Sequence, residues 1–145
     1  MEAVDQTNFL PQLIVRPKNG CGPQDVGCPL FYFLHDDNDQ ALNHLPYWHS
    51  LSNQGWIVGM PQPNNPSWVG AFHWKTDDAR KELLKNITSL HLRYSIDVNQ
   101  VVMGGYGSGG EFAFRLFLAG EIIGESFVLI NPRESMFEDG KNWDL

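Results

Sequence analysis

The glycine-rich run at residues 101–110 holds the side chains and spacing in this chain that best suit chemistry. Its one serine, Ser108, could attack an acyl carbonyl as a nucleophile. Its glycines would let backbone N–H groups approach an anion closely, because no side chain blocks the way. The run therefore admits two kinds of chemistry, covalent catalysis by a serine or phosphate binding by the backbone.

The elements on either side of this run favour a nucleophile elbow. Residues 99–104 form a short apolar run typical of a buried parallel strand, and residues 111–119 have the apolar spacing of a helix. In the elbow motif G-x-S-x-G, the serine lies on the sharp turn between strand and helix. Aligned on its glycines, this chain has Gly107 at the serine position. Ser108 then supplies an oxyanion N–H or an alternative nucleophile one residue late, and the elbow is expected to be inactive.

The same glycines also match a dinucleotide-binding pattern. Residues 105–110 fit G-x-G-x-x-G between a strand and a helix, where a pyrophosphate binds at the helix N-terminus. An acidic residue about 20 positions further on would hold the ribose. Glu125 precedes the next predicted strand and Glu134 comes late, so the match is partial and this alternative stays open.

The rest of the chain alternates between strand and helix patterns, which predicts an α/β fold. Apolar runs predict strands at 13–16, 30–34, 56–60 and Ser126–Ile130, and helical spacing predicts helices at 44–54 and from Thr76 to about Arg93. No repeat or Pro- or Ser-rich linker divides the chain. We therefore expect one domain over residues 1–145.

Composition limits the classes of partner. With 42% hydrophobic and 12% aromatic residues, the chain has enough apolar surface for a core. The net charge of -7, with scattered Lys and Arg, disfavours nucleic acid and anionic membranes as partners. Neither an apolar leader nor a membrane-spanning run is apparent, so the predicted location is cytoplasmic.

The two cysteines and one sequon are assigned no functional role. Cys21 and Cys28 could form a small disulfide loop in a secreted protein or half of a metal site, but without an export signal free thiols are expected. Asn86 begins a glycosylation sequon that falls within a predicted helix, and it is interpreted as chance.

Acidic and aromatic clusters suggest two further kinds of site. Asp36, Asp37 and Asp39 resemble the beginning of a calcium loop, but the glycine and glutamate of an EF-hand are absent, so solvated loop charge is expected and no metal or cofactor is predicted. The irregular segment 62–75 is expected to help line a pocket for a small acyl or aromatic ligand. The predicted pocket residues are Trp68, Phe72, His73 and Tyr106, with His73 also the candidate for a replacement base.

Several segments together resemble a known family. They are residues 29–35 (PLFYFLH), 44–48 (HLPYW), 54–58 (QGWIV), 61–62 (PQ), 97–110 and 127–132. Over about residues 11 to 132, the chain resembles the phospholipase/carboxylesterase branch of the α/β-hydrolase superfamily. The members of this branch are serine esterases. The resemblance implies a three-layer sandwich with a mostly parallel sheet and helices on both faces.

Three departures from that family bear on activity. Gly107 stands at the nucleophile position, and the His-Gly of the oxyanion loop is replaced by His35-Asp36, followed by Asp37. These carboxylates would oppose a developing oxyanion. The family's triad acid and histidine follow later strands that this chain lacks. The resemblance thus predicts a truncated, inactive domain, whose sheet edge at Ser126–Ile130 is open to homodimer formation. An active carboxylic-ester hydrolase with non-standard residues or a separate C-terminal part remains an alternative.

Overall fold

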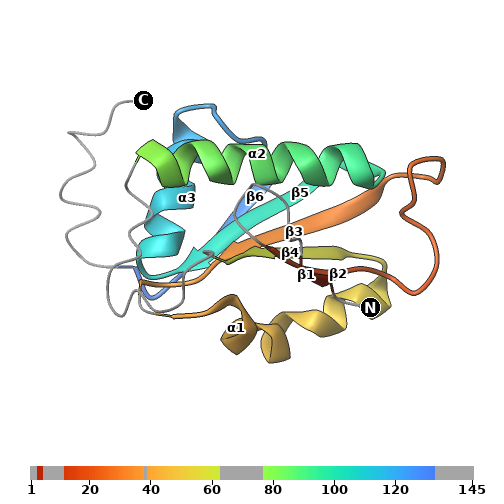
Figure 1. Ribbon diagram of the computed structural model, residues 1–145, viewed down its shortest axis with the longest axis horizontal. Helices are drawn as coiled ribbons and strands as arrows, with labels where there is room; N and C mark the ends of the chain where they lie inside the picture. The colour runs from red at the N-terminus through yellow and green to blue at the C-terminus, as the bar shows by residue number, and fades with distance from the viewer. Residues whose placement is uncertain (1–2, 5–11, 38, 63–76, 133–145) are drawn as a thin grey trace.

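The computed structural model describes residues 3–4, 12–37, 39–62 and 77–132 (Figure 1). Its six strands form one sheet in the order β1-β2-β4-β3-β5-β6. β3, β4, β5 and β6 are parallel to one another, whereas β2 pairs antiparallel with β1 and β4. The predicted mostly parallel α/β sheet is therefore confirmed. The strands are β1 (Ala3–Val4), β2 (Gln12–Val15), β3 (Cys28–Leu34), β4 (Ile57–Pro61), β5 (Ile96–Tyr106) and β6 (Ser126–Ile130).

Helices cover both faces of the sheet, which confirms the three-layer arrangement (Figure 1). α2 (Asp77–Arg93) and α3 (Ser108–Leu118) lie on one face, and α1 (Ala41–Trp48) lies on the other and continues into the 3-10 helix η1 (His49–Gln54). β3 shows why its sequence is apolar throughout, because alternate side chains enter opposite layers. Phe31 and Phe33 belong to the core cluster on the α1 side, and Tyr32 and Leu34 belong to the cluster on the other.

Two helices begin three residues earlier than their apolar spacing predicts. α1 starts at Ala41, whose backbone N–H donates to the side-chain oxygen of Gln62 at 2.6 Å. α3 starts at Ser108 and takes Gly110 into its first turn, packed so closely on β5 that a Cβ there would lie 2.6 Å from the carbonyl oxygen of Gly105. In both helices a contact with a neighbouring strand end extends the helix beyond its apolar pattern.

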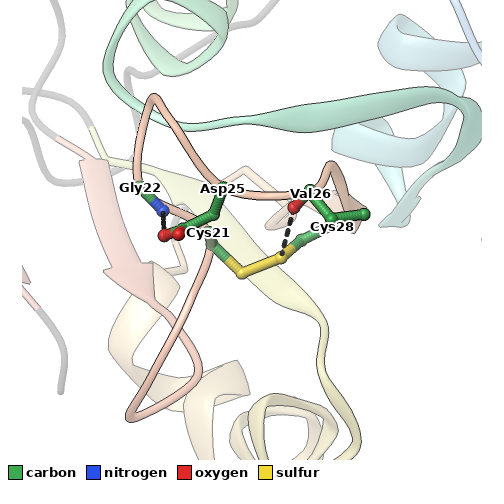
Figure 2. The surroundings of a disulfide bond; sticks show 5 residues. All are labelled: Cys21, Gly22, Asp25, Val26 and Cys28. Carbon is green, nitrogen blue, oxygen red and sulfur yellow. Dashed lines mark hydrogen bonds between the residues drawn. A yellow bond between two sulfur atoms is a disulfide. The ribbon is translucent and has the colours of Figure 1, made fainter.

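The loop between β2 and β3 is closed by a disulfide bond between Cys21 and Cys28, so the prediction of free thiols is wrong (Figure 2). Both cysteines are held at one turn, because Ser95 accepts the N–H of Cys28 at 2.9 Å and donates its own N–H to the carbonyl of Cys21 at 3.1 Å. Within the loop, the carboxylate of Asp25 accepts the N–H of Gly22 at 2.8 Å. Contacts with a distant turn, absent from the local pattern, bring the thiols together.

A buried polar chain joins the sheet to α2. The hydroxyl of Tyr32 donates to the side-chain oxygen of Gln12 at 3.1 Å, and the Gln12 amide donates to the backbone oxygen of Asn86 at 3.3 Å. All three residues have no exposed surface. Asn86 is therefore inaccessible to a glycan in the fold, in agreement with a sequon that arose by chance.

Tyr32→Phe should lower the free energy of unfolding by about 1–3 kcal/mol, because it leaves the buried acceptor of Gln12 without its donor. Burial also raises the pKa of Tyr32 well above its ordinary value of 10.0. Since the unfolded chain loses this proton first, wild-type stability should fall as the pH rises above about 10, and the fall should be smaller in Tyr32→Phe. Urea titrations at neutral and alkaline pH measure both effects, and equal alkaline losses would contradict the second.

None of the helices in the described ranges is long and apolar enough to span a membrane.

Candidate functional site

The predicted elbow lies where the carboxyl ends of β3, β5 and β6 meet the N-terminus of α3, on the opposite end of the sheet from the disulfide loop (Figure 1). Parallel α/β sheets place their ligands at this end. The turn is fixed to β6, because the N–H of Gly107 donates to the carbonyl of Ile130 at 2.9 Å. Residues from three strands that are distant in sequence thus converge on Gly107.

Gly107 has a backbone conformation that disfavours a side chain. Its φ is 56° and its ψ is -126°, in the left-handed half of backbone space, and it precedes the first residue of α3. Such sharp, strained geometry between a strand and a helix is that of a nucleophile elbow. The turn therefore has the geometry of an elbow, while its sequence provides no side chain at the apex.

The carboxylate of Asp36 fills the space that a side chain at Gly107 would need. A Cβ on Gly107 would lie 2.5 Å from the carboxyl carbon and from Oδ1 of Asp36. Asp36 Oδ1 accepts the backbone N–H of Ser108 at 2.9 Å and the Ser108 hydroxyl at 2.8 Å. It also accepts the N–H of Asp37 at 2.8 Å. One carboxylate oxygen therefore collects three donors at the N-terminus of α3.

This arrangement changes what the N-terminus of α3 can do. In an active elbow, the N–H after the nucleophile would stabilise a developing oxyanion. Here the corresponding N–H, that of Ser108, already binds an anion that belongs to the protein. Negative charge at a helix N-terminus is favourable, so Asp36 also acts as a cap for α3. An incoming oxyanion would have to displace this carboxylate and would be repelled by it.

The hydroxyl of Ser108 links the loop at Asp36 and Asp37 to the start of α3. Its Oγ donates to Asp36 and accepts the N–H of Asp37 at 2.9 Å. No histidine hydrogen-bonds to this hydroxyl within the described ranges, whereas a serine nucleophile requires a base within hydrogen-bond reach.

His35 supports the backbone of the Asp36 loop. Its ring is buried, and Nδ1 lies 2.6 Å from the carbonyl oxygen of Asp36, to which it donates. Burial is the largest influence on the pKa of His35 and holds it below its ordinary value, although the bond to Asp36 opposes that shift. His35 is therefore neutral at pH 7. The three residues of the predicted oxyanion loop all lie at the start of α3, where Asp36 contacts Gly107, Asp37 binds Ser108 and the carbonyl of His35 packs on Gly109.

The glycines of the dinucleotide pattern are used by the fold itself. A Cβ on Gly105 would lie 2.5 Å from the backbone nitrogen of Gly110, and one on Gly109 would collide with the carbonyl oxygen of His35. These glycines let α3 pack against the ends of β3 and β5. With Asp36 at the helix N-terminus as well, the geometry disfavours a bound pyrophosphate there.

Of the predicted pocket residues, the structure places Tyr106, whereas Trp68, Phe72 and His73 lie outside the described residues. Tyr106 ends β5, and its ring is 5.8 Å from that of His44 in α1. Both line a cavity of about 640 Å³ together with Asp39, Asn43, Tyr47, Trp48 and Ile130.

This cavity contains a hydrogen-bonded histidine–aspartate pair that sequence analysis missed. His44 Nε2 lies 2.6 Å from a carboxylate oxygen of Asp39, and both side chains are largely buried. His44 was placed at the start of a predicted helix without a functional role, and Asp39 was expected to be a solvated loop carboxylate. Their five-residue separation across the start of α1 was the available signal. Among the described residues, no group of three potential metal ligands converges.

Replacing Asp36 by alanine should destabilise the fold by about 1–3 kcal/mol, because the N–H of Ser108 at the start of α3 loses its acceptor. Asp36→Asn is the matched control, since it keeps an acceptor oxygen without the charge, and should cost about 0.3–1 kcal/mol. Urea denaturation followed by circular dichroism measures both. Equal stability of the alanine variant and the wild type would show that Asp36 does not cap α3.

Several solved structures have a similar fold. A substrate-bound, fluorophosphonate-binding serine hydrolase of Staphylococcus aureus matches with a TM-score of 0.69 and 12% identity, over 100% of this chain and 60% of that one. A fungal esterase of Rhizomucor miehei matches with a TM-score of 0.61 and 18% identity, over 100% of this chain and 50% of that one. An uncharacterised protein of Bacillus cereus matches with a TM-score of 0.64 and 22% identity, over 78% of this chain and 37% of that one.

The chain thus spans between 37% and 60% of the length of these three proteins, and the low identities show a shared fold alone. No protein-family model and no curated protein matches the chain in sequence.

Proposed function

Because the chain has the α/β-hydrolase fold, we propose that it is a phospholipase/carboxylesterase-type domain that lacks ester-hydrolase activity as it stands. The observation that carries this proposal is the Asp36 carboxylate, which lies where a side chain at Gly107 would project and binds the N–H of Ser108. The nucleophile is missing and the oxyanion site is occupied. Two independent requirements of acyl transfer are therefore unmet.

An active esterase that uses Ser108 is the alternative to this proposal. Ser108 would have to break its bonds to Asp36 and Asp37 and find a base, for which His73 is the candidate from sequence. Its hydroxyl donates to the carboxylate of Asp36 and not to a histidine, which is the usual base of a serine nucleophile. The contacts of Ser108 favour the inactive domain.

Labelling with a fluorophosphonate probe, read out by intact mass, tests the proposal on the purified full chain. We expect no adduct under conditions in which a known serine hydrolase is labelled completely. Hydrolysis of a short acyl ester should likewise not exceed the buffer rate. An adduct that maps to Ser108 and disappears in Ser108→Ala would overturn the proposal.

Ligand binding is the role that we propose in place of catalysis. The cavity beside the elbow, lined by Tyr47, Trp48 and Tyr106 among others, has a volume of about 640 Å³. Small-molecule sites commonly have this size and an aromatic lining with a few polar groups. A small acyl or aromatic compound is the proposed ligand class.

Association through β6 is a further part of the proposal. Within the described sheet, β6 pairs only with β5, and its apolar residues Phe127, Val128, Leu129 and Ile130 are only half-buried. By contrast, all five residues of β4 at the centre of the sheet are buried. An apolar edge of this kind favours pairing with another strand, and we propose a second copy of the chain as the partner.

The dimer should be measurable by sedimentation velocity over a wide concentration range. Val128→Lys places a charge on the half-buried edge strand and should shift the chain toward the monomer. Lys85→Ala on the exposed face of α2 is the matched control and should leave association unchanged. A wild-type chain that stays monomeric at the highest concentration would contradict the proposed dimer.

A further inference from the structure

Among the side chains that line the cavity beside the elbow, the ring of His44 offers an oriented acceptor nitrogen that could select its ligand. We infer that this cavity binds a neutral phenol-type ligand, whose hydroxyl donates to Nδ1 of His44 while its ring packs against Tyr47, Trp48 and Tyr106. The inference rests on the proposed ligand-binding role and names the ligand class and the residue that recognises it.

Asp39 determines which nitrogen of His44 is the acceptor. One oxygen of Asp39 accepts the N–H of Gln40 at 2.8 Å and the side-chain amide of Asn43 at 2.7 Å, and the other lies 2.6 Å from His44 Nε2. Desolvation is the largest influence on the pKa of Asp39 and raises it, but the bonds from Asn43, Gln40 and His44 together lower the pKa below its ordinary value. Asp39 is thus an ionised acceptor, so Nε2 is the nitrogen that donates to it, and Nδ1 is the nitrogen of the His44 ring that can accept a hydrogen bond.

The ring of His44 is held in place from its sides as well. Its centroid is 5.2 Å from that of Phe33 and 5.8 Å from that of Tyr106. Nδ1 has no hydrogen-bond partner within the ranges that the structure describes. An oriented acceptor in an aromatic cavity is suited to a ligand that carries one hydroxyl donor.

Charge and lining select among the ligands that could enter. The chain carries a net charge of -7, and the cavity itself contains the carboxylate of Asp39, so a ligand carboxylate would be repelled. An organic cation would be attracted to the aromatic rings. It would, however, compete with His44 for Asp39, whose oxygens already accept three hydrogen bonds. A neutral aromatic ring with a hydroxyl satisfies Nδ1 without breaking the Asp39–His44 pair.

The test compares phenol with anisole, which has the same ring but no donor, by titration of the full chain followed by NMR. We expect phenol to bind about three- to tenfold more tightly, the range for one neutral hydrogen bond. In ¹⁵N spectra of the imidazole, the Nδ1 resonance of His44 should shift on addition of phenol and should not shift on addition of anisole. Equal affinities, or tighter binding of benzylammonium or benzoate than of phenol, would overturn the inference.

Variants separate recognition from general effects on the fold. His44→Phe keeps an aromatic ring and should remove the preference for phenol while anisole binds as before. Asp39→Asn removes the carboxylate that holds the His44 proton on Nε2 and should reduce that preference. His49→Phe on η1 is the matched control and should leave it unchanged, because His49 is exposed and does not line this cavity. If His44→Phe retains the full preference, the inference fails.

Failure of this inference and failure of the proposed inactivity have different signatures. A fluorophosphonate adduct on a chain that still prefers phenol would overturn only the inactivity. Equal binding of phenol and anisole on an unlabelled chain would overturn only the assignment of the ligand.

Discussion

Gly107→Ser should destabilise the chain and should not make it reactive toward a fluorophosphonate probe. The Cβ of the new serine would lie 2.5 Å from the carboxyl group of Asp36. The backbone of the serine would also have to adopt a φ of 56°, which disfavours a side chain. Backbone strain of this kind costs about 1–3 kcal/mol, and overpacking costs a similar amount. We therefore expect a loss of about 2–5 kcal/mol in urea denaturation and no adduct with a fluorophosphonate probe.

The double variant Asp36→Gly, Gly107→Ser is the decisive control. It introduces the His-Gly pattern of the family that the sequence resembles and removes the carboxylate that the serine would meet. The overpacking part of the loss should be recovered and the backbone strain should remain, so the two substitutions should be non-additive by about 1–3 kcal/mol. Additive losses would show that Asp36 does not occupy the nucleophile space. An adduct on the double variant alone would place a base near the elbow, and an adduct on Gly107→Ser would contradict the prediction.

Removal of the disulfide should cause the second large loss of stability. Cys21 and Cys28 are separated by 7 positions, and closing a loop of about this length is worth about 2–3 kcal/mol through the entropy of the unfolded chain. Cys21→Ala, Cys28→Ala should therefore unfold at a lower urea concentration than the oxidised wild type. The reduced wild type should behave in the same way as the double variant.

Added reductant gives the matched control, because it should have no effect on the double alanine variant. Equal stability of reduced and oxidised wild-type protein would contradict a stabilising disulfide.

The disulfide bond also bears on the compartment in which the protein is found. Disulfides persist in oxidising compartments and are rare in the cytosol, so this finding counts against the cytoplasmic location, which stays a prediction from sequence.

Periodicity in the sequence predicted the secondary structure wherever burial follows a local pattern. Residues 30–34 and Ser126–Ile130 were predicted to be strands and lie in β3 and β6. Helical spacing from Thr76 to about Arg93 predicted α2, in which Leu83 and Leu90 are fully buried. These signals are local, since each depends on side chains within one element facing one layer.

Helix starts and paired side chains were predicted less well. The early start of α1 depends on a bond from Ala41 to Gln62, and Gly110 enters α3 because it packs on Gly105. The disulfide likewise depends on the turn at Ser95, which comes from a different part of the chain. No pattern within one element reports such partners.

The sequence by itself determined that glycine stands at the apex of an elbow and that a carboxylate follows His35. Only the tertiary structure decided that the carboxylate of Asp36 enters the space left by the missing side chain and binds Ser108, 72 positions away. It also brought Tyr106 at the end of β5 to the Asp39–His44 pair beside α1. The physical reason is that composition and spacing govern burial along one element, whereas hydrogen bonds between elements depend on where the folded sheet places their ends.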